Sequence, residues 1–231
     1  MIDITFDFQT DTLAGKDPDY YSKTMKEYHR LLWSKSLPNG ECMQLEGNRG
    51  GYYLRWNDFY FGSDSIIISF RYNKKLMDQV KDAVPDYDVF MKELFHKSYT
   101  VGGTILFPMH AMSLNQRRGM HPRIRDRFDL TLECIRRFYN GETSPLIKGL
   151  EQDRTFFELF VDFKGYVDFF FLNDCVSADY GKVNCWYGDM TFQHNAMPQT
   201  LDDYWKFLDY QSDFLEKRNQ RIKLYADRNN L

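Results

Sequence analysis

Aromatic side chains are the feature that most constrains the fold of this 231-residue chain. Phe, Tyr and Trp make up 17% of the residues, and all apolar residues together make up 43%. Rings of this size stabilise a fold by leaving water, so the chain needs a large packed interior. A chain of this length can bury such an interior within one unit. We therefore expect an ordered, single domain over residues 1–231.

The charge balance limits the classes of partner. The formal net charge is −3, which gives no general reason to bind nucleic acid or an anionic membrane. The first residues, MIDITFDFQTDT, have acids where a signal peptide needs a basic start. No segment reaches the roughly 18 apolar residues of a membrane span. We expect a cytoplasmic protein without membrane association, in which any phosphate site is local.

The cysteines and histidines indicate no metal or redox centre. No Cys-x-x-Cys pair occurs, so we interpret the four cysteines as reduced thiols: Cys42, Cys134, Cys175 and Cys185. Three histidines lie singly, without the spacing of metal ligands: His29, His96 and His194. The chain also contains neither a Walker loop nor a G-x-G-x-x-G turn. We predict no metal and no cofactor.

Hydrophobic periodicity predicts strands in the first half of the chain. Apolar and polar residues alternate over 2–8, which is typical of a strand with one buried face. Ser22 is placed to cap a helix that ends before Pro38-Asn39-Gly40. Three extended runs then predict an antiparallel meander, with turns at 48–51 and 57–58: residues 42–47, 51–56 and 59–72.

Helical spacing dominates the rest of the chain. We expect helices over 74–84 and 86–97, on either side of Pro85, followed by a strand over 100–107. Further helical patterns cover 124–139, then 156–171 with an interruption near Gly165, and a C-terminal segment from Leu201 that docks first and then becomes solvated. The sequence therefore predicts an α+β fold, with an N-terminal antiparallel sheet packed against a mainly helical C-terminal half.

The most unusual segment runs from His110 to Arg137 and contains seven arginines and no lysine. A polar loop follows the predicted strand, and Pro122 is placed to open the next helix. Loops between a strand and a helix are common functional sites. The planar guanidinium binds phosphate or carboxylate through two parallel hydrogen bonds, which lysine cannot do. The segment therefore suggests oriented binding of an oxyanion.

Candidate roles follow from this pattern. We expect Arg118, Arg123 and Arg127 to hold the anion and Asn115 to orient it. Thr131 lies one helical turn from Arg127 and is placed to line the edge of the same pocket. His110 is the candidate catalytic residue, because imidazole exchanges protons near neutral pH.

Simpler interpretations stay open for several of these features. Arg125 with Asp129, and Asp129 or Glu133 with Arg136 and Arg137, have the spacing of surface ion pairs on a helix. Ser63, Asp64 and Ser65 fit turn chemistry better than a nucleophile. Aromatic residues on the extended runs fit core packing better than base stacking: Tyr52, Tyr53, Phe59, Tyr60 and Phe61.

Long stretches of the chain resemble an uncharacterised bacterial family of about this length, a domain of unknown function. The matching stretches are DPDYYSKTMKEYHRLLWSKSLPNG, NQRRGMHPRIRDRFDLTLECIRRFYNGETSPL, FVDFKGYVDFFFLNDCVSADY and KRNQRI. The resemblance covers nearly the whole chain and supports one full-length bacterial unit. It implies no activity.

Two functional hypotheses follow. The first is a cytoplasmic protein that binds a phosphate-bearing ligand, a nucleotide or a nucleic-acid end, through the arginine-rich loop and helix, with hydrolase or transferase activity. The second is a non-catalytic module with a protein partner, in a mobile element or a defence system. Convergence of His110, Asn115, Arg118 and Arg127 in a concave pocket would favour the first. Arginines paired outward with Asp129 and Glu133 would favour the second.

Overall fold

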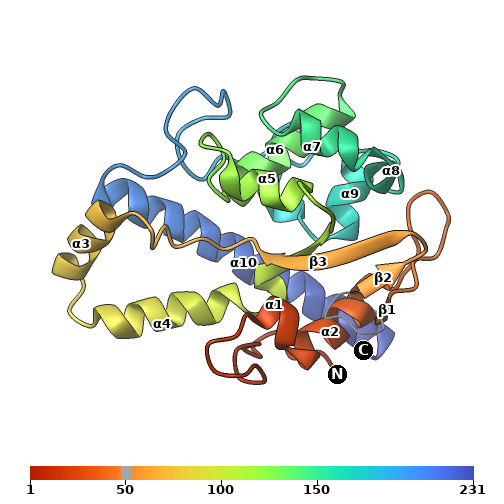
Figure 1. Ribbon diagram of the computed structural model, residues 1–231, viewed down its shortest axis with the longest axis horizontal. Coiled ribbons are helices and arrows are strands. Elements are labelled where there is room, and N and C mark those ends of the chain that lie inside the picture. The colour runs from red at the N-terminus through yellow and green to blue at the C-terminus, as the bar shows by residue number, and fades with distance from the viewer. Residues whose placement is uncertain (48–53) are drawn as a thin grey trace.

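The computed structural model describes residues 1–47 and 54–231 and has an α+β fold, which confirms the predicted class (Figure 1). Its antiparallel sheet has the order β1-β2-β3-β4, so each strand pairs with the next along the chain. The strands are β1 (Glu46–Gly47), β2 (Leu54–Trp56), β3 (Phe59–Ser65) and β4 (Thr104–Pro108). Every residue of β4 is buried, which places this strand at the centre of the fold.

Helices surround the sheet. Two precede it: α1 (Pro18–Tyr21) and α2 (Lys23–Trp33). Between β3 and β4 lie α3 (Lys74–Ala83), α4 (Tyr87–Ser98) and the 3-10 turn η1 (Val101–Gly103). The C-terminal half contains α5 (Leu114–Met120), α6 (Phe128–Tyr139), α7 (Ile147–Gln152), α8 (Arg154–Glu158), α9 (Phe163–Phe169), the 3-10 turn η2 (Asn173–Cys175) and α10 (Leu201–Asn229).

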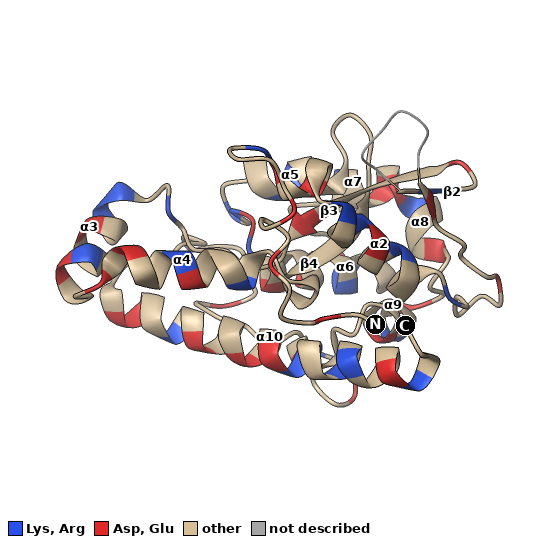
Figure 2. Ribbon diagram, turned by 90° about the horizontal axis from the view of Figure 1, so that it is seen from below, with Lys and Arg blue, Asp and Glu red and all other residues tan. Residues whose placement is uncertain are grey.

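The long helix α10 runs along the molecule and joins its parts (Figure 1). Trp205 of α10 packs edge-to-face on Phe90 of α4, with ring centroids 5.6 Å apart. Lys and Arg are interspersed with Asp and Glu along α4 and α10, in keeping with a net charge near zero (Figure 2). Among the described residues, no helix has both the length and the apolar character needed to cross a bilayer.

The aromatic residues pack into the predicted interior. Phe160 is fully buried, and its ring centroid lies 5.2 Å from Tyr166 and 5.1 Å from Phe169. Trp33 of α2 is also fully buried and lies 5.2 Å from Phe170. Both contacts with Phe160 are edge-to-face, the arrangement that the ring quadrupoles favour. The dense aromatic segment after residue 156 therefore forms the core between α2, α8 and α9.

The predicted cap of α2 and the predicted helix break at Pro85 are both present in the structure. The Ser22 hydroxyl accepts a hydrogen bond from the Met25 amide at 3.0 Å and donates one to Asp11, so Ser22 caps α2 as predicted. Asn73 caps α3 in the same way. The helices α3 and α4 lie on either side of Pro85, because proline cannot donate the backbone hydrogen bond of a continuous helix.

The predicted strand over residues 2–8 is wrong. Ile2 and Phe8 are buried, which accounts for the alternating pattern, but the segment is a series of turns. The carboxylate of Asp3 accepts a hydrogen bond from the Thr5 amide, and that of Asp7 accepts one from the Gln9 amide. These local bonds from short acidic side chains compete with a sheet ladder. The other extended runs are shortened, and Tyr52, Tyr53 and the predicted turn at 48–51 lie partly or wholly outside the described residues.

In the second half, two helix boundaries and the burial of the last helix also differ from the prediction. Pro122 does not open a helix, because Arg125 and Asp126 have φ angles of 53° and 63° and α6 begins at Phe128. The segment 156–171 breaks at Val161, where φ is 69°, while Gly165 lies inside α9. The end of α10 stays docked rather than becoming solvated, since Ile222 and Ala226 are buried.

Candidate functional site: an acidic cleft

A cleft of about 470 Å³ lies where α1, β3, the end of β4 and the start of α5 meet. We call it the acidic cleft. It is lined by Asp17, Asp19, Tyr20, Gly62, Ser63, Asp64, Phe107, Pro108, Met109, His110, Ala111, Ser113, Asn115 and Gln116. Three carboxylates belong to this lining, whereas no lysine or arginine of the described chain does. The lining is therefore acidic in composition.

Two of the carboxylates have strongly perturbed pKa values. Burial raises the pKa of Asp64 to about 6, although the guanidinium of Arg118 opposes the shift. Burial and the nearby Asp64 carboxylate raise the pKa of Asp19 well above its usual value. Carboxyl groups whose pKa is raised by desolvation in a cleft are typical of functional sites.

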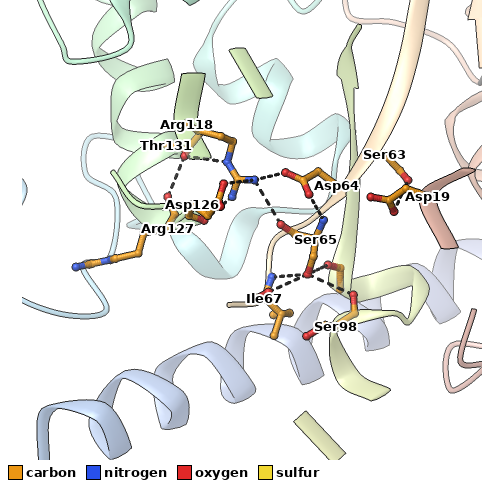
Figure 3. A network of polar contacts seen from close by, with 11 residues as sticks. Asp19, Ser63, Asp64, Ser65, Ile67, Ser98, Arg118, Asp126, Arg127 and Thr131 are labelled. Carbon is orange, nitrogen blue, oxygen red and sulfur yellow. Dashed lines mark hydrogen bonds and ion pairs between the residues drawn. The ribbon is translucent and has the colours of Figure 1, made fainter. Parts of the chain in front are cut away.

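Two consecutive residues of β3, Ser63 and Asp64, contact different partners (Figure 3). The Ser63 hydroxyl donates a hydrogen bond of 3.0 Å to Asp19, which holds α1 against the strand. The next residue, Asp64, points toward Arg118 instead, because successive side chains of a strand alternate in direction. Residues 63–65 all lie within β3, and at its end the Ser65 hydroxyl accepts a hydrogen bond from the Ile67 amide at 3.1 Å, the local bond of a serine turn.

Arg118 supports Asp64 from outside the cleft. Its guanidinium is fully buried and lies 2.5 Å from the Asp64 carboxylate, whose side chain keeps 29% exposure. The same guanidinium donates to the backbone carbonyl of Asp126 at 2.5 Å and to the Thr131 hydroxyl at 3.3 Å (Figure 3). Arg118 and Thr131 therefore fix the position of Asp64 and do not line the cleft.

His110 lines the cleft and is held by a buried acid. Its Nε2 atom lies 2.5 Å from the carboxylate of Asp153, and its Nδ1 atom lies 3.0 Å from the backbone oxygen of Ala111. Burial alone would lower the pKa of His110, but the hydrogen bonds to Asp153 and to Ala111 raise it overall. The imidazolium form donates to both partners, so this side chain is oriented before any ligand arrives.

Asn115 brings an unsatisfied acceptor to the same cleft. Its side-chain oxygen is buried and has no hydrogen-bond partner among the described residues. A buried carbonyl oxygen without a donor costs free energy, so such a group favours a ligand that donates a hydrogen bond. The structure thus brings together two of the residues chosen from the sequence, His110 and Asn115. It adds Asp19, Ser63 and Asp64, which come from other parts of the chain.

Comparison with known proteins identifies the family of this chain but no activity. A model described as a family of unknown function, DUF6994, matches residues 2–222. The chain belongs to this family. No curated protein and no solved structure matches it. The resemblance to a domain of unknown function is therefore confirmed, and the description of DUF6994 assigns no chemistry to the cleft.

In this DUF6994 member, Arg127 is a structural anchor. Its guanidinium is 1% exposed and bonds both carboxylate oxygens of Asp129, at 3.0 and 2.5 Å. It also donates to the backbone oxygens of Tyr187 and Ala196. Asp129 in turn accepts a hydrogen bond from the Trp186 amide. The pair therefore fastens residues 186–196, a stretch without helix or strand, to the start of α6.

Two further arginines hold the same stretch. Arg123 donates to the backbone oxygen of Phe192 at 2.6 Å, and Arg137 donates to that of Met190 at 2.7 Å. The predicted ion pairs of Glu133 with Arg136 and Arg137 are present. The expectation that Asp129 and Glu133 form surface ion pairs is wrong as to the surface, because both side chains are buried.

The histidines and acids of the described chain form no group of three or more that could hold a metal ion. The acidic cleft itself offers its carboxylates, the His110 imidazole, the Ser63 hydroxyl and the Asn115 amide. These groups can bind a cation, accept hydrogen bonds and transfer protons.

Proposed function

We propose that this protein binds a small ligand carrying a positively charged amine in the acidic cleft. The observation that supports this proposal is the composition of the lining, which contains Asp17, Asp19 and Asp64 but no lysine or arginine, since Arg118 pairs with Asp64 from outside the cleft. An ammonium group would restore the ionised state of the buried carboxyls by supplying a nearby positive charge. Charge-assisted hydrogen bonds of this kind are about twice as strong as neutral ones.

Other lining groups suit the same ligand. The Asn115 oxygen needs a hydrogen-bond donor, and an ammonium group has several. Tyr20 adds an aromatic ring to the lining, and ring faces attract cations. The ligand can be small, since a cleft of about 470 Å³ lies within the size range of small-molecule sites.

A phosphate-bearing ligand fits this cleft less well. It would lie beside three carboxylates, with His110 as the cationic side chain of the lining. The guanidinium groups of Arg118 and Arg127 already bond Asp64, Asp129, Thr131 and backbone oxygens, so a phosphate would have to displace these partners. Binding of phosphate by Arg118, Arg123, Arg127, Asn115 and Thr131 stays a prediction, and we favour the amine.

Calorimetric titration tests the proposal. The probes are methylamine, 1,4-diaminobutane and glucosamine, with glucose 6-phosphate as the anionic comparison. We expect at least one amine to bind, and Asp64→Asn to weaken it by about tenfold or more, because a charged hydrogen bond contributes about 1.5–3 kcal/mol. Asp19→Asn provides a second variant that leaves the Arg118 ion pair intact.

The matched control is Asp82→Asn, which changes an exposed carboxylate on α3, outside the lining of the cleft. It should leave amine affinity unchanged. The proposal fails if none of the amines binds, if both cleft variants bind as tightly as the unaltered protein, or if the sugar phosphate binds in the cleft in preference to the amines.

Amine affinity should also depend on pH. Asp64 attracts an ammonium group only when ionised, and its pKa is about 6. Affinity should therefore rise as pH increases through 6 and level off above 7. About a tenfold loss is expected at pH 5, where roughly one carboxyl in ten is ionised. The same titration on Asp64→Asn should lack this step, whereas an unchanged profile would show that another group controls binding.

A further inference from the structure

A second hollow, of about 330 Å³, lies on the N-terminal side of α1. We call it the basic hollow. It is lined by Gln9, Thr12, Leu13, Ala14, Gly15, Lys16, Pro18, Arg71, Phe95 and Tyr99. Lys16 and Arg71 belong to this lining, and no carboxylate does. Its charge is therefore opposite to that of the acidic cleft.

Both cations lack an acidic partner. Within residues 1–47 and 54–231, neither Lys16 nor Arg71 forms a salt bridge. In the segment 117–137, by contrast, each arginine except Arg125 bonds a carboxylate or a backbone oxygen. Two cations that share one hollow without counter-charges repel each other, and an anion between them removes that cost.

The Arg71 side chain is restrained by a contact with the Phe95 ring. Its guanidinium carbon lies 5.1 Å from the centroid of the Phe95 ring. Such a contact restrains the long side chain while its N–H groups stay available to a carboxylate or a phosphate. The preceding residue, Phe70, is fully buried and has a φ angle of 53°, which is rare for a bulky side chain. This unfavourable backbone conformation occurs where the chain passes from the buried Phe70 to the exposed Arg71.

A tight turn presents Lys16. The Lys16 amide donates to the Leu13 carbonyl at 2.9 Å, and Gly15 has a φ angle of 73°. The third position of such a turn requires a positive φ, which glycine adopts without strain. The turn and the contact between Arg71 and Phe95 come from segments more than fifty residues apart. Their shared hollow is thus a product of the fold.

We propose that the basic hollow is a second binding site, which takes a small anionic group, a carboxylate or a phosphate, between Lys16 and Arg71. The site is distinct from the acidic cleft in its residues and charge, and it does not depend on the function proposed there. Tyr99 lines the basic hollow. Burial and the carboxylates of Asp19 and Asp17 raise the pKa of Tyr99, whereas Arg71 lowers it.

Titration with inorganic phosphate and, separately, with sodium acetate tests this site. Amide chemical shifts report the position of binding, and each titration yields a Kd. We expect saturable shifts in residues 12–16 and around Arg71. Arg71→Gln should weaken binding by about tenfold or more, and Lys16→Gln by a smaller factor, because only the arginine binds an oxyanion through two bonds. Comparing the Kd for phosphate with the Kd for acetate shows which of the two anionic groups the site prefers.

Both substitutions change exposed side chains, so the variants should fold. Lys75→Gln, an exposed change on α3, is the matched control and should bind normally. Asp64→Asn should retain anion binding even if amine binding in the acidic cleft is lost or never observed. The site is disproved if neither anion gives saturable shifts in these residues, or if Arg71→Gln binds both anions with unchanged affinity.

Discussion

Replacing Arg127 by methionine should lower the free energy of unfolding by about 3–5 kcal/mol. The substitution leaves Asp129, which is fully buried, without the cation that bonds both of its oxygens. It also removes the donors to the Tyr187 and Ala196 carbonyls. The loss is large because an unpaired buried carboxylate keeps its desolvation cost. Urea unfolding followed by circular dichroism measures the change.

Two further variants make this expectation specific. Arg154→Met removes an exposed ion pair with Glu151, whose side chains are 51% and 47% exposed, and should cost less than about 1 kcal/mol. Arg127→Met combined with Asp129→Leu removes both charges and should be more stable than Arg127→Met alone. If Arg127→Met unfolds at the same urea concentration as the unaltered protein, the buried pair does not anchor this segment.

Replacing Phe160 by alanine should cost about 3–5 kcal/mol of stability. Phe160 is fully buried, and its ring centroid lies 5.2 Å from Phe156 and 5.4 Å from Phe170. Neighbouring rings cannot move far enough to fill the space, so the variant loses both the burial of the ring and the contacts around the cavity. Thermal or urea unfolding measures the loss.

The matched control is Tyr210→Ala on α10, where the aromatic side chain is 57% exposed. Its stability should change by no more than about 0.5 kcal/mol. Phe160→Leu should lie between the two, because leucine retains much of the volume. A loss below 1 kcal/mol for Phe160→Ala would mean that the aromatic segment after residue 156 does not form the main core.

Local signals explain why much of the fold could be predicted from the sequence. The caps Ser22 and Asn73 act on amides three residues away, so the chain itself specifies where α2 and α3 begin. Failures occurred where tertiary contacts decide the backbone. Arg125 and Asp126 adopt positive φ angles while Arg118 bonds the Asp126 carbonyl, and a helical pattern cannot reveal that contact.

The candidate site was only partly predictable for the same reason. His110 and Asn115 were found because they lie in a polar segment between a strand and a helix. Asp19 and Asp64 stand in different segments and meet only after α1 packs on β3. The number of arginines suggested a ligand, but Arg118, Arg123 and Arg127 bond groups of the protein itself. Sequence reports how many cations a segment contains, but the fold decides whether their counter-charges come from the protein.

The arginine anchors determine how the stretch 186–196 responds to thermal fluctuations. A segment without helix or strand usually exchanges its amide hydrogens through small local openings. Here Arg127, Arg123 and Arg137 hold four of its carbonyls, and Asp129 accepts the Trp186 amide. Opening the segment therefore requires exposing the buried Arg127 and Asp129 charges. The Trp186 amide hydrogen should therefore exchange as slowly as the amides of α6, which exchange only when the whole protein unfolds. This irregular stretch then belongs to the same cooperative unit as the core.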